Sequence, residues 1–142
     1  FMTEQGAGSD IAATTVRALP DGEGAYRLSG DKWFCSNPDA ALAMVLARIE
    51  GAPEGIQGVS LFLMPRTLPD GTPNAYRIIR LKDKLGTRSM ASGEIRLEGA
   101  RAWRVGEAGR GFQQMADMVN NSRLSNGMRA AGLMRRACSE AF

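Results

Sequence analysis

Apolar and polar residues alternate along short segments between residues 14 and 105, which is the pattern of β-strands with one buried face. Turn-forming Pro, Asp and Gly residues separate these segments, for example at Pro69-Asp70-Gly71. About eight short strands at this regular spacing predict a mostly β fold, a small antiparallel β-barrel or sandwich. The predicted strands are residues 14–18, 25–29, 32–36, 42–49, 59–64, 76–81, 93–97 and 101–105.

Two places in this pattern need local interpretation. Residues 42–49 form a nearly continuous apolar run, which fits a buried strand or a short helix. The length of the run and its Val and Ile content favour the strand. Gly30-Asp31 separates two alternating segments and predicts a hairpin. Alternation along the second segment then places Trp33 and Phe34 on opposite faces, with Trp33 packing away from any site that Phe34 lines.

The apolar spacing becomes helical after residues 107–111, and no proline follows Gly111. A single helix to the end of the chain would be about 48 Å long at 1.5 Å per residue. The alternative is two helices that are broken near Asn126-Gly127. We therefore expect a β-domain over residues 1–106 and a helical region over residues 107–142. The apolar stripe comprises Phe112, Met115, Val119, Leu124, Met128, Ala131 and Met134.

The sequence starts abruptly at Phe1-Met2 and ends inside the helical pattern without a helix stop signal, so we expect a piece of a longer protein. Composition then removes several mechanisms. The chain contains no histidine, which excludes imidazole-based triads, dyads and metal sites made by this chain alone. Cys35 and Cys138 lie too far apart for a CxxC motif, so we expect no metal site and reduced thiols in a cytoplasmic protein.

The charge balance and the apolar runs limit the partners. The net charge of +3, from 18 Lys and Arg against 15 Asp and Glu, is too small to predict nucleic-acid binding alone. No apolar run approaches the ~18 residues that a membrane span needs, so no membrane partner is expected.

The segment from Thr3 to Asp10 is the strongest chemical candidate. Gly6 and Gly8 allow backbone N–H groups to approach a ligand closely, and Thr3 and Ser9 add hydroxyl groups. On these residues alone, a phosphate or cofactor loop and an ordinary turn both remain open. The segment lacks the Gly-Lys-Ser/Thr ending of a P-loop, and no strand precedes it.

This segment, residues 2–10, resembles the sequence that opens the middle β-domain of acyl-CoA dehydrogenases. The resemblance implies a middle β-barrel domain over residues 1–106 and the first helix of a truncated C-terminal helical domain over residues 107–142. It also implies FAD as cofactor and α,β-desaturation of an acyl-CoA thioester. Family-like segments follow in the same order at residues 28–37, 85–89 and 105–112.

Within this family, the sequence is most similar to the adaptive-response, alkylation-protection branch. The similar segments are residues 65–71, 80–86 and 134–137. Members of that branch keep the fold and FAD and are associated with DNA. The alternative function is therefore a flavin-containing, DNA-associated protein with little dehydrogenase turnover. The family also implies a homo-oligomer, a tetramer or a dimer. From the residues themselves, Lys82-Asp83-Lys84 is interpreted as a solvated turn.

The resemblance assigns cofactor roles to two groups of residues. Met2 and Thr3 are expected to contact the flavin ring, and Gly8 and Ser9 to lie near the FAD pyrophosphate. On the strand, Phe34 stands where many relatives carry a tryptophan beside the flavin, and Ser36 stands where they carry a threonine that hydrogen-bonds the flavin edge. Cys35 lies between them and is included in the expected cofactor site. The alternative is that Phe34 and Cys35 are core residues.

Substrate contacts are expected from Ser9 and from two helix residues, Asn120 and Arg123. Ser122 occupies the position at which some family members carry the catalytic glutamate, and its hydroxyl cannot remove a proton from the thioester α-carbon. Glu4 belongs to the loop motif, and nothing in the sequence would raise its pKa. We therefore expect no catalytic base in this chain.

Overall fold

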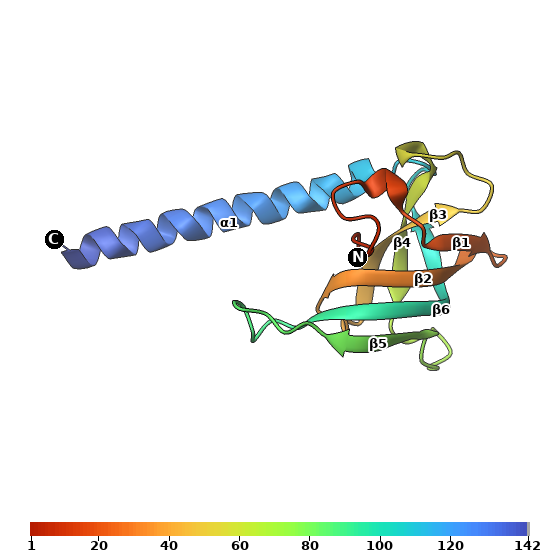
Figure 1. Ribbon diagram of the computed structural model, residues 1–142, viewed down its shortest axis with the longest axis horizontal. Helices are drawn as coiled ribbons and strands as arrows, with labels where there is room; N and C mark the ends of the chain where they lie inside the picture. The colour runs from red at the N-terminus through yellow and green to blue at the C-terminus, as the bar shows by residue number, and fades with distance from the viewer. Residues whose placement is uncertain (142) are drawn as a thin grey trace. The chain divides into compact units, whose positions relative to one another are not determined.

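The computed structural model describes residues 1–141, and over these residues six strands form one sheet that closes into a barrel (Figure 1). The strand order is β2-β1-β3-β4-β6-β5, and a further pairing of β2 with β6 closes a ring from which β5 is left out. The prediction of a mostly β barrel is confirmed. The strands are β1 (Arg17–Pro20), β2 (Ala25–Ser36), β3 (Leu42–Ile49), β4 (Val59–Pro65), β5 (Tyr76–Leu81) and β6 (Ser92–Val105).

Strand β6 organises the barrel because it is long enough to serve three neighbours. It pairs with β2 along nearly its whole length, with β5 through its first half and with β4 through its last residues. These pairings are antiparallel, as predicted. The exception is the pairing of β1 with β3, which is parallel in the register Arg17↔Arg48 and Ala18↔Ile49.

The hairpin predicted at Gly30-Asp31 is wrong, since β2 runs through this point as one strand. Gly30 has a φ of 132°, and a Cβ atom there would lie 2.9 Å from Val16 Cγ2. The glycine therefore lets the strand bend past Val16 without ending it. On β6, Gly99 (φ 85°) is the extra residue of a bulge and does not end a strand either. About eight predicted segments thus become six strands in the described residues.

The barrel interior is filled by the inward side chains of all the ring strands. Tyr26 and Phe62 pack edge to face there, with ring centroids 5.1 Å apart. Burial of an aromatic ring such as Phe62 contributes about 1.5–3 kcal/mol. The fully or nearly fully buried cluster is Val16, Ala18, Leu28, Cys35, Val45, Ala47, Phe62, Met64, Ile95, Leu97, Ala100 and Ala102.

Helix α1 (Gly111–Ala141) follows the barrel and is continuous through Asn126-Gly127, so the alternative of two broken helices is wrong. Its 31 residues span about 47 Å. Gly111 is required at its start, because a Cβ atom there would lie 2.4 Å from the carbonyl carbon of Ser60. Among the described residues, no helix has both the length and the apolar character to cross a membrane.

The contacts divide the chain into one unit at Phe1–Phe112 and a second that begins at Gln113, and each is described by itself. The helix was expected to reach Phe142, which lies outside the described residues.

Candidate functional site

The loop that carries Met2 and Thr3 lies along strand β2 (Figure 1). The backbone N–H of Trp33 donates a hydrogen bond of 2.8 Å to the Thr3 carbonyl. The Lys32 ammonium donates one of 3.0 Å to the Met2 carbonyl. Thr3, which is half-buried, therefore lies beside the stretch of β2 that carries Phe34. The structure brings these two sequence-predicted residues together.

The buried side chain of Glu4 anchors this loop to the barrel. Its Oε1 atom accepts hydrogen bonds from Lys32 Nζ at 2.8 Å and from the Val16 N–H at 3.2 Å. Its Oε2 atom accepts from the N–H and the hydroxyl of Thr15, at 2.6 and 2.7 Å. Both members of the ion pair are buried, with side-chain exposures of 4% for Glu4 and 0% for Lys32. The pair ties the loop to the start of β1 and to β2.

These partners determine the protonation state of Glu4. Burial acts to raise the pKa of the carboxyl group, but attraction to Lys32 and the hydrogen bonds from Lys32 and Thr15 outweigh it and hold the pKa below its ordinary value. Burial lowers the pKa of Lys32, an effect that Glu4 only partly offsets. Glu4 is therefore an ionised structural anchor, and its lone pairs are used by the chain itself. It has the wrong pKa and the wrong surroundings for a general base.

The turn after Glu4 leaves two glycines facing open space. Glu4 and Ala7 exchange backbone hydrogen bonds of 3.1 and 3.2 Å, which close the turn. A Cβ atom on Gly6 or on Gly8 would meet no atom within 4 Å, and neither residue has a positive φ. Neither the fold nor the local conformation therefore requires glycine at these positions. Ser9, one residue further on, is exposed. Close approach by a ligand or a partner would explain the glycines.

Strand β2 presents Phe34 and Ser36 on its outer face. Phe34 is 54% exposed, Ser36 is exposed, and Cys35 between them is fully buried. The prediction that Trp33 and Phe34 face opposite sides is wrong, because the register of β2 shifts between Lys32 and Cys35. This bulge turns both aromatic rings toward one cation, the ammonium of Lys82.

Lys82 is held by rings and by a carboxylate. Its Nζ atom lies 3.4 Å from the centroid of the Trp33 ring, 4.5 Å from that of Phe34 and 2.6 Å from Glu94 Oε1. Cation–π contacts contribute roughly 0.5–2 kcal/mol each, with the upper values for desolvated cations. The Lys82 side chain is only 11% exposed. The interpretation of this region as a solvated turn is therefore wrong for Lys82, although Asp83 is 96% exposed.

Cys35 contributes to the interior of the barrel and not to its outer face. Its side chain is fully buried in the core cluster, and burial raises the pKa of the thiol to about 11. The thiol is therefore protonated near neutral pH. Because the side chain points inward, Cys35 could reach a ligand on the outer face only through backbone atoms.

The helix residues of the predicted substrate site lie in the second unit. Asn120, Ser122 and Arg123 are all exposed on α1. Arg123 Nη1 donates a weak hydrogen bond of 3.4 Å to Asn120 Oδ1, one turn earlier. The Ser122 hydroxyl contacts the sulfur atom of Met118 at 3.9 Å.

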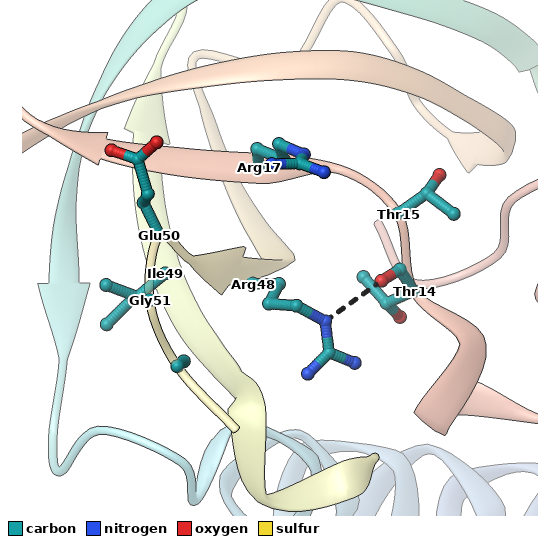
Figure 2. A pocket seen from close by; sticks show the side chains of 8 residues that line it. Thr14, Thr15, Arg17, Arg48, Ile49, Glu50 and Gly51 are labelled. Atoms are coloured by element: carbon teal, nitrogen blue, oxygen red, sulfur yellow. Dashed lines mark hydrogen bonds between the residues drawn. The ribbon is translucent and has the colours of Figure 1, made fainter. Parts of the chain in front are cut away.

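A pocket of about 390 Å³ lies where β1 and β3 run parallel (Figure 2). Arg48 lines it, and its guanidinium points toward Thr14, to whose carbonyl it donates a hydrogen bond of 3.4 Å. The same guanidinium donates to the carbonyls of Ala12, Pro53 and Gly55 at 2.8, 2.6 and 3.0 Å. Arg48 therefore joins two loops to each other and is already committed to the fold.

A second pocket of about 410 Å³ opens beside the N-terminal loop. Glu4 and Gly6 line one side of it. Asp31 and Arg96 line another side and form an ion pair with a shortest distance of 2.7 Å. The pocket adjoins the loop motif, but Thr3, Phe34 and Ser36 are not part of its lining.

Comparison with known proteins identifies the fold. The family model for the acyl-CoA dehydrogenase middle domain matches residues 1–100. The chain belongs to the acyl-CoA dehydrogenase family. AidB of Escherichia coli is 43% identical over 141 residues, which cover 99% of this chain and 25% of AidB. This match agrees with the resemblance to the adaptive-response branch of the family.

A second relative within the family comes with a solved structure. Acyl-CoA dehydrogenase family member 11 of Caenorhabditis elegans is 41% identical over 144 residues, covering 98% of this chain and 23% of that protein. The crystal structure of the Caenorhabditis elegans protein ACDH-11 in complex with C11-CoA superposes with a TM-score of 0.83 at 41% identity, over 89% of this chain and 22% of that one. The chain thus spans about a quarter of the length of these relatives.

Sequence reasoning missed the charged groups that surround the predicted residues. Lys32 occupies an inward position of a strand pattern, which is an unusual place for a lysine and a usable signal. Nothing in the sequence indicates that Lys82 and Glu94 meet beside Trp33, because their contact depends on the register of three strands.

Proposed function

We propose that this chain is the middle domain, with the start of the C-terminal helical domain, of an FAD-dependent acyl-CoA dehydrogenase-like oxidoreductase that acts on CH–CH bonds. Residues 1–106 form the middle domain in this proposal, and residues 107–142 begin the helical domain. The whole protein is a homo-oligomer in the cytoplasm. Family membership supports the reaction class. The single observation that carries the proposal is the meeting of the Thr3 loop with the Phe34 stretch of β2.

The residues at this meeting point fit a flat, mostly apolar ring with polar edges. Phe34 offers an exposed aromatic surface, and Ser36 offers a hydroxyl two residues further along the same face. Thr3 adds backbone groups and a hydroxyl on a loop that Glu4 and Lys32 hold in place. An isoalloxazine ring needs this combination of stacking surface and hydrogen-bond partners.

Each predicted residue has a role in this proposal. Met2 and Thr3 bind the ring, and Phe34 and Ser36 form its wall and edge. Gly8 and Ser9 bind the pyrophosphate, for which the open backbone at the glycines is suited. Cys35 takes part through its backbone alone. Ser9, Asn120 and Arg123 orient the acyl-CoA. FAD bound at these residues would supply an acceptor for the β-hydride of the thioester.

We assign no catalytic base within this chain. Glu4 is ionised and is held by Lys32, Thr15 and Val16. The Ser122 hydroxyl is far too weak a base for a thioester α-proton. The ring-binding residues of the N-terminal loop and of β2 supply binding, orientation and exclusion of water at the flavin ring.

The first test is cofactor retention by the full-length protein. Thr3→Ala and Ser36→Ala each remove one hydroxyl, and the loss of one hydrogen bond corresponds to roughly a three- to tenfold weaker affinity for FAD. Thr72→Ala is the matched control, because its hydroxyl donates to Asp70 within a surface turn. Titration of the apoprotein with FAD measures the affinities. A full-length protein that binds no FAD would refute the proposal.

The alternative is a flavin-containing, DNA-associated alkylation-response protein with little dehydrogenase turnover. The similarity to AidB over 99% of the chain favours it. Reduction of the bound FAD by short acyl-CoAs, followed in a stopped-flow instrument, and DNA binding at increasing salt separate the two functions. Rapid reduction without salt-sensitive DNA binding would support the dehydrogenase, and the reverse pattern would support the alternative.

A further inference from the structure

Strand β2 carries an extra residue opposite Glu94. On this strand Lys32 pairs with Ile95 of β6, and Cys35 pairs with Gly93. Three steps along β2 therefore match two steps along β6. A bulge of this kind turns the side chains of the bulged strand, and bulges are frequent beside functional sites.

Strand β5 carries a matching extra residue on the other side of β6. Here Ile78 pairs with Ile95, Arg80 with Glu94 and Leu81 with Gly93. Again three steps match two. Two independent strands are thus distorted at the same position of the strand between them.

Side chains from the β2 bulge and from the residue after β5 converge on the outer face. Trp33 and Phe34 come from the bulge in β2, and Lys82 directly follows the end of β5. The Lys82 ammonium lies 3.4 and 4.5 Å from the two ring centroids. Glu94 points to the same face and accepts hydrogen bonds from Lys82 at 2.6 Å and from Arg80 at 2.9 Å.

We propose that Lys82 is a positioning residue for the flavin, which holds the Phe34 ring as the wall of the cofactor site and places a positive charge behind it. This inference rests on the proposed function. The rings of Trp33 and Phe34, together with the Glu94 carboxylate, form a cage around the Lys82 ammonium. One ring of this cage, Phe34, is 54% exposed and is the residue that we assign to the flavin wall. A cation behind that ring therefore acts on whatever stacks against it.

The charge has a chemical consequence for the bound cofactor. A flavin bound there would gain one net negative charge on uptake of two electrons and one proton. Arg80 and Lys82 carry two positive charges and Glu94 carries one negative charge, so the cluster is left with one net positive charge. Attraction between this charge and the reduced ring favours reduction over oxidation.

The main experiment measures the midpoint potential and the visible spectrum of FAD in the full-length protein. Lys82→Met removes the charge and keeps the length of the side chain. We expect about a tenfold loss in the preference for reduced over oxidised flavin, which is about 30 mV for a two-electron couple. Lys82→Arg keeps the charge and should restore most of the potential.

Lys84→Met is the matched control for the charge. Its ammonium donates to the Met90 carbonyl at 2.6 Å and to the Ser92 hydroxyl at 3.1 Å. Removal of this charge should leave the potential and the spectrum unchanged. An equal shift for Lys84→Met and Lys82→Met would overturn the proposal, since it would show a general effect of surface charge.

A second measurement tests the cage without any flavin. Reductive methylation of the apoprotein, read by mass spectrometry, should be slow at Lys82 and should become several times faster in Phe34→Ala. The rate at Lys84 should not change. Equal rates at Lys82 in both proteins would overturn the cage.

A third variant keeps the proposal falsifiable if Lys82→Met does not fold. Glu94→Gln leaves Lys82 between the rings and adds one net positive charge, so it should raise the midpoint potential. A slow-reacting Lys82 combined with unchanged potentials in every variant would overturn the role toward flavin while leaving the proposed function intact. A wild-type protein without FAD would instead overturn both.

Discussion

Two lysine–glutamate pairs lie on opposite faces of the sheet where β2 pairs with β6, and they differ in what surrounds them. Lys32 and Glu4 meet inside the protein, where Lys32, Thr15 and Val16 donate hydrogen bonds to the Glu4 carboxylate. Lys82 and Glu94 meet on the outer face, where two aromatic rings complete the surroundings. The inner pair contacts mostly backbone groups, whereas Lys82 of the outer pair contacts two ring faces.

This difference separates two tasks. The inner pair fixes where Met2 and Thr3 lie, because Lys32 binds the Met2 carbonyl as well as Glu4. Its loss should therefore unfold or loosen the loop. The side chains of the outer pair bind other side chains and do not hold a loop in place. The loss of this pair should therefore change the surroundings of the exposed Phe34 ring and leave most of the free energy of unfolding intact.

The largest effect is expected from the inner pair. Lys32→Met leaves Glu4 buried without its cation, which typically costs about 3–5 kcal/mol of unfolding free energy. Urea denaturation of the full-length protein measures this loss. Arg77→Gln is the control, because its ion pair with Glu98 is about half exposed and should contribute less than about 1 kcal/mol. A loss for Lys32→Met as small as that of the control would contradict the assigned anchoring role.

The same pair predicts a dependence of stability on pH. The folded pKa of Glu4 lies below the ordinary value of 4.5, so its contribution is fully present above pH 4.5 and is lost as the pH falls through the folded pKa. The difference in melting temperature between wild type and Glu4→Gln should therefore shrink on acidification from about pH 7 to about pH 3. A difference that stays constant over this range would show that Glu4 is not the titrating group.

A smaller loss is expected where β2 bends. Gly30→Ala introduces a Cβ atom 2.9 Å from Val16 Cγ2 at a residue with a φ of 132°. Overpacking and backbone strain of this kind cost about 1–3 kcal/mol each. Thermal unfolding should show the loss. An unchanged melting temperature would mean that β2 relaxes freely at this point.

The smallest effect on stability is expected in the loop. Gly8→Ala meets no atom within 4 Å and needs no positive φ, so the free energy of unfolding should change by less than about 0.5 kcal/mol. The affinity for FAD should nevertheless fall, because the added methyl group stands where we expect the pyrophosphate to approach. Calorimetric titration with FAD measures it. Equal affinities would place the pyrophosphate elsewhere.

The alternation of apolar residues predicted most of the elements. Residues 42–49 and 76–81 are strands with the predicted bounds, and the helix begins at Gly111. The segments around Gly30 and Gly99 were predicted to break, since glycine usually marks turns. In the barrel these glycines instead allow bends and bulges, and this depends on Val16 and on the paired strand.

The candidate site was likewise predicted only in part from the sequence. The loop motif and the aromatic strand were identified by their residues, and the absence of histidine already limited the chemistry. That Trp33 joins Phe34 on one face, while the next residue, Cys35, points inward, follows from a bulge that no local pattern reveals. Alternation assumes two residues per repeat, and one extra residue reverses every face beyond it.

By itself, the sequence determined the barrel, the helix and the family, because these depend on periodicities and motifs that are local in the chain. Tertiary structure alone decided that β1 and β3 are parallel, that Glu4 meets Lys32 and that the Lys82 ammonium lies over two aromatic rings. Each of these contacts joins residues far apart in sequence. Their geometry depends on strand register, which the whole barrel sets together as it closes.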